Sequence, residues 1–374
     1  MRVGLLHFNH IMKNGLIGWD AIDTWDWKPN YGDMLVCAAI LRQVEHSDSK
    51  GVLFGYRAPK NLDYVVMRGS TYLHQEFDFD SAIATLESIQ CPVAVVGIGA
   101  QSAGLDPTFL DGHEPARRFV SMLAERSKSI SCRGAFSAQV LERLGAKSLR
   151  ITGCPSLFYQ GAPQKVSIPP LLESFGRVGL SIHSELGNSI FCRDGAKTRA
   201  LHGELISALE ASDARYVIFE QGNEVELKLS NRKYPFDVRK AAAAYVLERI
   251  GLSGKMSEEM LISRFVSVLS VEEWVGKGRD LDAMIGFRFH GNMVGLMQGL
   301  PCLYYVYDSR LHEFCELYKL PYQNVEEELS PPITKMIEHD WEAANAAIRR
   351  CYDELLAFYQ ENDVVLSEEF APPS

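Results

Sequence analysis

The stretch "DLDAMIGFRFHGNMVGLMQGLPCLYYVYDSRLHEF", residues 280–314, is the part of the sequence that decides the fold class. An apolar run, 283–289, is broken by Arg288 and followed by His290, after which a helical pattern of small residues begins. Gly299-Leu300-Pro301 and a second apolar run come next. This order predicts two buried parallel strands joined by a helix, with a cation and an imidazole where the first strand ends.

The same alternation of apolar runs and helical patterns extends along the whole chain. Because the runs are continuously apolar, we expect parallel strands that are buried on both faces. The strand candidates are 2–8, 51–56, 63–67, 92–99, 129–132, 149–152, 177–183, 215–221, 264–270 and 302–307. They predict an α/β protein with two Rossmann-like domains whose parallel sheets face a cleft.

Composition shifts place the predicted domain boundaries. Residues 1–160 form the first predicted domain and 177–325 the second, and the segment 161–176, with three prolines and no period, is the expected linker. Residues 326–374 form a helical tail whose amphipathic pattern predicts a long helix that packs back on the domains.

Charge and cysteine content exclude several classes of protein. The balance of 38 basic against 48 acidic residues, a net charge of −10, argues against a nucleic-acid-binding protein. Eight scattered cysteines form no C-x-x-C pair, and no metal-ligand spacing is present, so we expect no metal. No apolar run approaches the length of a membrane span, and we expect a cytoplasmic protein.

Arginines at strand ends are the strongest candidates for function. Arg133 closes the strand 129–132 before a helix, and Arg288 occupies the same position after 283–287, with His290 two residues further on. Arginine beside a helix N-terminus binds carboxylate or phosphate well, and an imidazole there serves as general acid or base. If the strand persists, Arg288 and His290 share one face. The alternative is that such an arginine only bonds loop carbonyls or an internal carboxylate.

Three motifs resemble those of the polysaccharide pyruvyl transferase family. "NYGDMLV" (30–36) is similar to its N-terminal Asn-x-Gly-Asp pattern, and "SCRGAFSAQVLERLGAKSLRITGCPSLF" (131–158) to its central signature. "FRFHGNMVGLMQGLPCLYYVYDSRLHEF" (287–314) resembles its C-terminal signature. The sequence departs from the pattern at three residues: Arg68 replaces a glycine, Cys154 an aspartate and Arg310 a lysine.

The resemblance implies a GT-B-like fold and transfer of the enolpyruvyl carbons of phosphoenolpyruvate onto two hydroxyls of a sugar. No cofactor is implied, and phosphoenolpyruvate is the co-substrate. Carried over, Arg133, Arg288 and His290 are the expected catalytic residues. The expected donor-binding residues are these three together with Arg68, Gly291 and Arg310.

Groups that bind the acceptor are expected at strand ends and before helices. The candidates are Asn30, Asp33, Gln101, His183 and Glu220. Asp33 is equally well explained as a helix cap. Trp19, Trp25 and Trp27 offer rings for stacking on a sugar, although tryptophans are commonly buried for packing alone.

The expected partners are a sugar, oligosaccharide or lipid-linked glycan, the last bringing the protein to a membrane surface. Two other functions stay open: a GT-B glycosyltransferase that uses a nucleotide sugar, and a binding protein that has kept the scaffold without catalysis.

Overall fold

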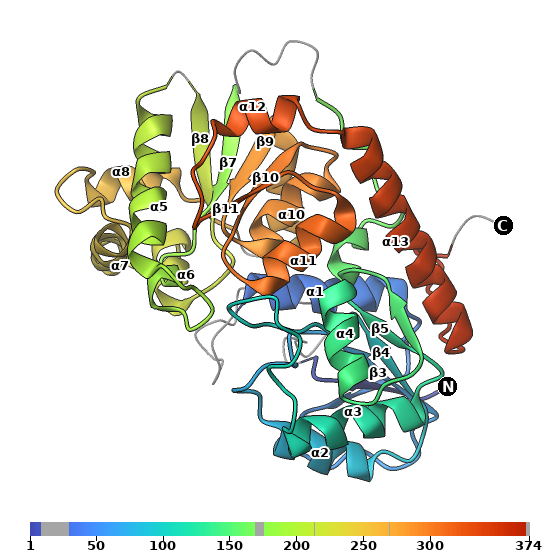
Figure 1. The fold of residues 1–374 in the computed structure, drawn as a ribbon. Helices are drawn as coiled ribbons and strands as arrows, with labels where there is room; N and C mark the ends of the chain where they lie inside the picture. Colours follow the sequence, from blue (N-terminus) through green and yellow to red (C-terminus); the bar gives the residue numbers. More distant parts are fainter. Residues whose placement is uncertain (9–29, 169–175, 213, 269, 372–374) are drawn as a thin grey trace.

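The computed structural model describes residues 1–8, 30–168, 176–212, 214–268 and 270–371. Two parallel sheets, one in each half of the chain, carry the fold (Figure 1). This arrangement confirms the predicted class, α/β with two Rossmann-like sheets in a GT-B-like pair. The aromatic segment with Trp19, Trp25 and Trp27 lies outside the described residues.

The first half is built on a four-stranded parallel sheet in the order β2-β1-β3-β4. Its strands are β1 (Val3–Leu6), β2 (Ser49–Val52), β3 (Tyr64–Arg68) and β4 (Val93–Val96). A parallel pair, β5 (Ile130–Cys132) and β6 (Leu149–Ile151), follows and is joined through a bridge between Ile98 and Cys132. The helices are α1 (Tyr31–Gln43), α2 (Phe79–Ser88), α3 (Glu114–Arg126) and α4 (Ala135–Arg143).

The second half holds a five-stranded parallel sheet in the order β11-β10-β9-β7-β8. Its strands are β7 (Arg177–Ser181), β8 (Arg215–Phe219), β9 (Ala283–Gly286), β10 (Cys302–Val306) and β11 (Tyr322–Asn324). Its first helices are α5 (Gly195–Glu210), α6 (Glu224–Ser230), α7 (Phe236–Arg249), α8 (Glu258–Arg264) and α9 (Val271–Gly276). The later ones are α10 (Phe289–Met297), α11 (Ser309–Tyr318), α12 (Pro332–Ile337) and α13 (Trp341–Glu361).

Burial explains which predicted strands formed. Strands β1, β3, β4, β9 and β10 are buried at every residue, as their apolar runs require. The prediction of a strand over 264–270 is wrong: Phe265 makes one isolated bridge to Ile218, and α8 extends to Arg264. The short strand β11 has a half-polar sequence, Tyr-Gln-Asn, and carries no such apolar signal.

The two halves meet along a boundary that we call the interdomain seam. There α1, α4 and the 3-10 helix Pro155–Phe158 of the first half face α10 and α11 of the second. In Figure 1, α1 lies between the halves, and α13 runs along one side of both. The C-terminal helix therefore returns to the first half, where Tyr359 donates a hydrogen bond of 2.7 Å to Gln43.

Asn362, which ends α13, is expected to stabilise this return. Its side-chain oxygen accepts the N–H groups of Lys128 and Ser129, and its amide donates to Ser129 Oγ at 3.0 Å. Asn362→Ala leaves these groups without partners and should lower the free energy of unfolding by about 1–3 kcal/mol. Urea denaturation measures the loss. Gln360→Ala, two residues earlier at an exposed position, should stay within about 0.5 kcal/mol of wild type. Equal effects of the two changes would refute this role.

Candidate functional site

His290 occupies the first turn of α10 at the interdomain seam. Strand β9 ends at Gly286, and Arg288 is the extended residue that precedes the helix. The expectation that Arg288 and His290 share one strand face is therefore wrong. Helix α10 begins at Phe289, between the two residues. Their side chains therefore do not follow the period of a strand, in which residues two apart share a face.

Guanidinium groups from both halves approach the Phe289 ring beside His290. The guanidinium carbon of Arg133, from the first half, lies 5.7 Å from the centre of that ring, and the carbon of Arg310, from the second, lies at the same distance. Both arginines lower the pKa of His290, which places their charges near the imidazole. The seam thus brings together Arg133, Arg310 and His290, whereas the sequence led us to expect Arg133 and Arg288 beside His290.

Arg133 is oriented by the first half alone. Its Nε donates to Gly97 O at 3.0 Å and its Nη2 to Gly69 O at 3.5 Å. Gly99 leaves room for the side chain, since a Cβ there would lie 2.8 Å from Arg133 Cδ. Among the described residues, the polar partners of Arg133 are thus carbonyl oxygens, and no carboxylate forms an ion pair with it.

Arg68 adds a third cation at the end of β3. It is 2% exposed, with Nη1 3.0 Å from the Asp33 carboxylate and Nη2 3.2 Å from His7 Nδ1. The charges of both Arg68 and Asp33 act on the His290 imidazole. Arg68, predicted to face the cleft, therefore lies in the same cluster, already paired with a carboxylate.

Arg288 does not present a free guanidinium. Its Nε donates to Ile182 O at 2.9 Å, and its Nη2 forms a 2.8 Å ion pair with Glu226, which is completely buried. Arg288 is itself 7% exposed. Of the two interpretations that the sequence left open for this arginine, the geometry matches the internal carboxylate, and a buried pair of this kind is costly to separate.

The two helix N-termini predicted to attract anions are filled by the chain's own side chains. At α4, Glu313 of α11 accepts the Ser137 N–H at 2.5 Å and the Ser137 hydroxyl at 2.8 Å. At α10, Gln221 Oε1 accepts the N–H groups of His290 and Gly291 at 2.8 and 3.2 Å. Gly291, predicted to bind the donor, therefore already has an internal partner.

Burial and neighbouring cations keep the His290 imidazole neutral. Desolvation lowers the pKa of His290 well below its ordinary value, and the charge of Arg133 lowers it further. Asp33 opposes this, while Arg310 and Arg68 add smaller effects in the same direction as Arg133. An anion bound among these arginines would reverse their contribution and raise the pKa again.

The five predicted acceptor residues are spread along the seam. Asn30 is the cap of α1 and accepts the Asp33 N–H, so Asn30 and not Asp33 is the capping residue. Gln101 spans the seam and donates to Asp308 at 2.8 Å. His183 is half-buried, and burial followed by the charge of Arg288 lowers its pKa well below the usual value.

Glu220 is an interior group. It is 1% exposed and accepts a hydrogen bond from Ser230. Burial raises the pKa of Glu220 to about 8, so its carboxyl is mostly protonated at neutral pH. Glu220 therefore exposes almost no surface to a sugar in this arrangement.

A pocket opens at the seam next to this cluster. It has a volume of about 310 Å³ and is lined by the loop Ala103–Leu105 from the first half and by Tyr307, Asp308 and His312 from the second. Tyr307 accepts a hydrogen bond from Arg310 Nη2 at 3.2 Å, which connects the pocket to the arginines. The volume suits a small polar molecule.

Three acidic residues of the site were not predicted from the sequence, because each lies far along the chain from the residue that it contacts. Glu226, Asp308 and Glu313 contact Arg288, Gln101 and Ser137 from other elements. Glu226 and Glu313 belong to short helices whose sequences resemble ordinary amphipathic ones. Gln221 carried a signal, since it follows Glu220 at the carboxyl end of β8.

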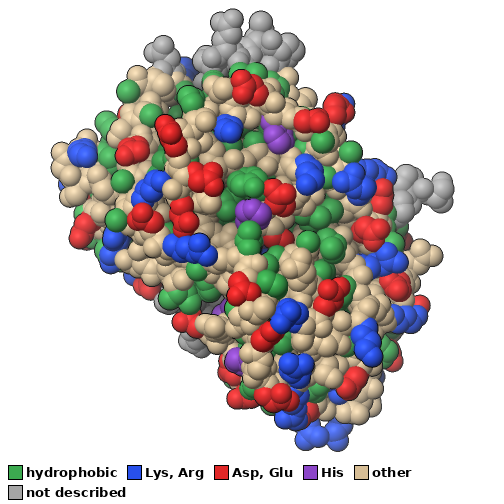
Figure 2. All heavy atoms as spheres, viewed as in Figure 1, with side chains coloured by type: hydrophobic (Ala, Val, Ile, Leu, Met, Phe, Trp, Pro, Cys, Tyr) green, Lys and Arg blue, Asp and Glu red, His purple; other side chains and the backbone are tan. Residues whose placement is uncertain are grey.

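On the face in Figure 2, acidic and basic side chains are interspersed. In the described part of the chain, no cluster of three His, Cys, Asp or Glu side chains is arranged to hold a metal. None of the helices described is both long and apolar enough to cross a bilayer.

Glu313→Gln should change how stability depends on pH. Burial raises the pKa of Glu313 to about 7 from an ordinary value of 4.5, so the folded protein holds an extra proton between these values. Wild type therefore loses stability as the pH rises through this window, whereas glutamine does not ionise. The melting temperature of the variant minus that of wild type should increase from about pH 5 to 8.

The exposed neighbour Glu316 on the same helix provides the control. Glu316→Gln should not reproduce this increase over the same pH range. A flat difference for Glu313→Gln would mean that Glu313 titrates as an ordinary surface carboxylate.

Solved structures are similar to this chain only at very low identity and with TM-scores below 0.5. A UDP-GlcNAc 2-epimerase from Neisseria meningitidis is 10% identical with a TM-score of 0.44, covering 97% of this chain and 100% of that chain. The enzyme of the same name from Methanocaldococcus jannaschii is 11% identical with a TM-score of 0.42, covering 96% and 99%. The glycosyltransferase SnogD from Streptomyces nogalater is 12% identical with a TM-score of 0.34, covering 96% and 95%.

No curated protein has significant sequence similarity to this chain. The sequence model of the polysaccharide pyruvyl transferase family, in contrast, matches residues 30–309. The match begins at the cap of α1 and includes Arg133, Arg288 and His290, so it covers the first two motifs that suggested the resemblance and residues 287–309 of the third. The chain belongs to the polysaccharide pyruvyl transferase family.

Proposed function

We propose that this protein transfers the enolpyruvyl carbons of phosphoenolpyruvate onto two hydroxyls of a sugar in a glycan precursor, forming a pyruvate ketal. The observation that carries the proposal is the convergence of Arg133 and Arg310, from opposite halves, beside His290. Phosphoenolpyruvate is a small polyanion with a carboxylate and a phosphate, so it requires more than one cationic contact.

Arg133 is the proposed primary contact for the donor. Arg68, Arg288 and Arg310 lie 3.0, 2.8 and 3.7 Å from carboxylates of the chain, whereas the described contacts of Arg133 are with carbonyls. Arg133 forms no ion pair with a described carboxylate, although its charge acts on Glu313, and a buried cation without such a pair favours an anionic ligand. Arg310 and Arg68 strengthen the positive potential from either side, and Arg288 holds the segment before α10 in place through Glu226.

His290 is the proposed general acid. Protonation of the methylene carbon turns it into the methyl group and leaves a positive C2, which the first sugar hydroxyl attacks as it loses its proton. The C2–O bond to phosphate then breaks, phosphate leaves with that electron pair, and the second hydroxyl adds to C2 and loses its proton. The products are the ketal and inorganic phosphate, with no change of oxidation state. A well-placed acid contributes on the order of 10²–10⁴-fold to such a step.

Turnover with a panel of sugars and glycan precursors tests the reaction. Wild type should release phosphate from phosphoenolpyruvate, and the acceptor should gain the mass of pyruvic acid less water. His290→Gln should reduce kcat by about 10²–10⁴-fold, and Arg133→Ala should reduce kcat/KM by at least about 10²-fold. Arg117→Ala, an exposed arginine on α3, is the matched control and should behave as wild type.

Thermal stabilisation by single ligands separates the alternative functions. Phosphoenolpyruvate should raise the melting temperature of wild type but not of Arg133→Ala. Stabilisation by uridine or guanosine diphosphate without any effect of phosphoenolpyruvate would favour a nucleotide-sugar glycosyltransferase. Binding of phosphoenolpyruvate with no phosphate release for any acceptor would favour a non-catalytic binding protein.

Donor binding should be accompanied by proton uptake at His290. Burial lowers the pKa of His290 well below 6.5, and the negative charges of the donor should raise it. Between the two values the complex holds a proton that the free protein lacks, so affinity should fall as pH rises through the bound-state pKa.

Calorimetric titration with phosphoenolpyruvate in buffers of different ionisation enthalpy measures this uptake. The phosphate of the donor also titrates near neutrality, so the informative quantity is the difference from His290→Gln. Wild type should take up close to one more proton than the variant. Equal proton exchange in the two proteins would exclude His290 as the group that becomes charged.

A further inference from the structure

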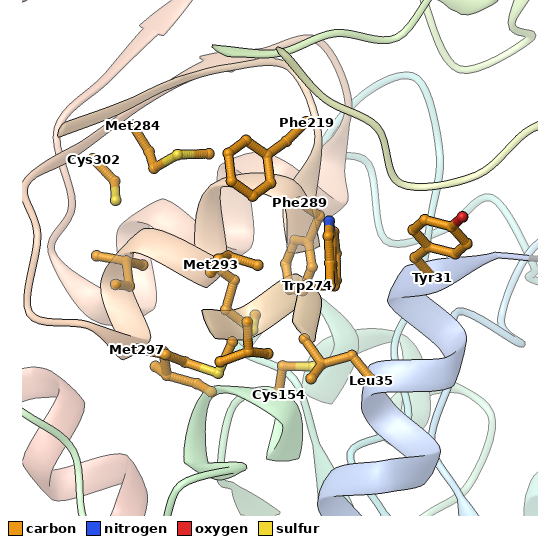
Figure 3. Packing of buried hydrophobic residues seen from close by; sticks show 14 of the residues in the cluster. Tyr31, Leu35, Cys154, Phe219, Trp274, Met284, Phe289, Met293, Met297 and Cys302 are labelled. Carbon is orange, nitrogen blue, oxygen red and sulfur yellow. The ribbon is translucent and has the colours of Figure 1, made fainter. Parts of the chain in front are cut away.

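A chain of three buried side chains runs behind the His290 ring. Cys154 Sγ lies 3.7 Å from His290 Nε2 and 2.9 Å from Ser156 Oγ, and Ser156 Oγ lies 3.1 Å from Met293 Sδ. Cys154, Ser156 and Met293 have no exposed surface, and His290 is 4% exposed. Figure 3 shows Cys154, Met293 and Phe289 packed in one cluster between α10 and α1. The hydrogen-bonding atoms of these three side chains and of His290 Nε2 must therefore be partners of one another.

The last member of the chain sets the direction of its hydrogen bonds. A methionine thioether accepts but never donates, so the Ser156 hydroxyl is the donor in its contact with Met293. A hydroxyl has one proton, so Ser156 accepts from the Cys154 thiol. The thiol proton is then also used, and Cys154 Sγ accepts from His290. All three contacts are satisfied together only when Nε2 of His290 carries the ring proton.

The opposite side of the ring favours the same assignment. Nδ1 of His290 is buried and has no hydrogen-bond partner among the described residues. It lies against Gly32 of α1, where a Cβ would collide with it. Gln221 Nε2 also lies close to Gly32. The oxygen of the same amide accepts two backbone N–H groups, so the atom near Gly32 is the amide nitrogen, which donates. A buried N–H at Nδ1 would have nothing to donate to.

We propose that Cys154, Ser156 and Met293 hold His290 in the Nε2–H tautomer, which makes Nδ1 the nitrogen that exchanges protons with the ligand. Cys154 is a positioning residue in this scheme, because it acts through His290. The catalytic part of the inference rests on the proposed function, but the tautomer itself does not. Because Gly32 covers Nδ1, the nitrogen meets the donor only when α1 and α10 separate.

The experiment is nitrogen NMR of the full-length protein labelled with ¹⁵N-histidine, at a pH where His290 is neutral. Ring nitrogens with and without a proton have distinct shifts, and His290→Gln identifies the signals of this residue. Wild type should show a protonated Nε2 and a bare Nδ1. A protonated Nδ1 in wild type would overturn the proposal.

Two variants that leave His290 itself unchanged test whether the neighbouring side chains select its tautomer. Ser156→Ala removes the acceptor of the thiol proton, so the thiol can turn to Nε2 and a measurable population of the Nδ1–H tautomer should appear beside the Nε2–H form. Met293→Leu conserves volume but removes the final acceptor, and it should give a mixture. Met297→Leu, one turn further along α10 and equally buried, is the control and should resemble wild type. Unchanged tautomers in both test variants would overturn the proposal.

Kinetics provide the second measurement. Ser156→Ala should lower kcat roughly tenfold, the effect of about one net hydrogen bond, without raising the KM for phosphoenolpyruvate. Cys154→Ser keeps a donor and an acceptor in place and should retain the wild-type tautomer and pH profile, whereas Cys154→Ala should not. The tautomers could respond as described while no sugar is ever found to be modified. In that case the proposed function fails, and the assignment of the His290 tautomer holds.

Discussion

The candidate site depends on the burial of several arginines at the boundary between two domains. Like charges in a medium of low dielectric constant repel one another, and each loses its hydration, so such a cluster forms only where partners offset it. Asp33, Glu226 and Asp308 provide those partners for Arg68, Arg288 and Arg310. Arg133 is held by carbonyl dipoles instead, which leaves its charge available to a ligand.

The second half supplies groups to helix ends of the first half. Glu313 of the second half reaches the start of α4, and Gln221 O of the second half accepts the Tyr31 N–H at the start of α1 with a distance of 2.6 Å. A ligand anion at either helix N-terminus must displace one of these internal acceptors. Under the proposed function, donor binding would therefore require movement along the seam, and the same movement would uncover His290 Nδ1 from Gly32.

Much of the fold and part of the candidate site could be predicted from the sequence, for physical reasons that particular residues illustrate. Continuously apolar runs such as 302–306 have to be buried on both faces, and this determined the parallel sheets. Arg68 and Arg133 lie at carboxyl ends of strands in such sheets, so their approach to the seam followed from topology. The placement of His290 on a strand failed, because an apolar run does not reveal where the chain begins its first helical turn.

Pairings between distant segments were not predictable from local pattern. Nothing near Arg288 indicates that Glu226, 62 residues earlier, neutralises it. The contact between Cys154 and His290 spans 136 residues and unites two motifs that looked independent in the sequence. Such contacts depend on how the two halves dock, which no single segment encodes.

A crystal structure of the protein with phosphoenolpyruvate bound tests the central claim most directly. The account predicts that the donor lies at the seam with one anionic group on the Arg133 guanidinium and its methylene carbon facing His290 Nδ1, with α1 displaced from α10. A donor bound away from Arg133, or bound there with its methylene carbon remote from the imidazole, would contradict the account.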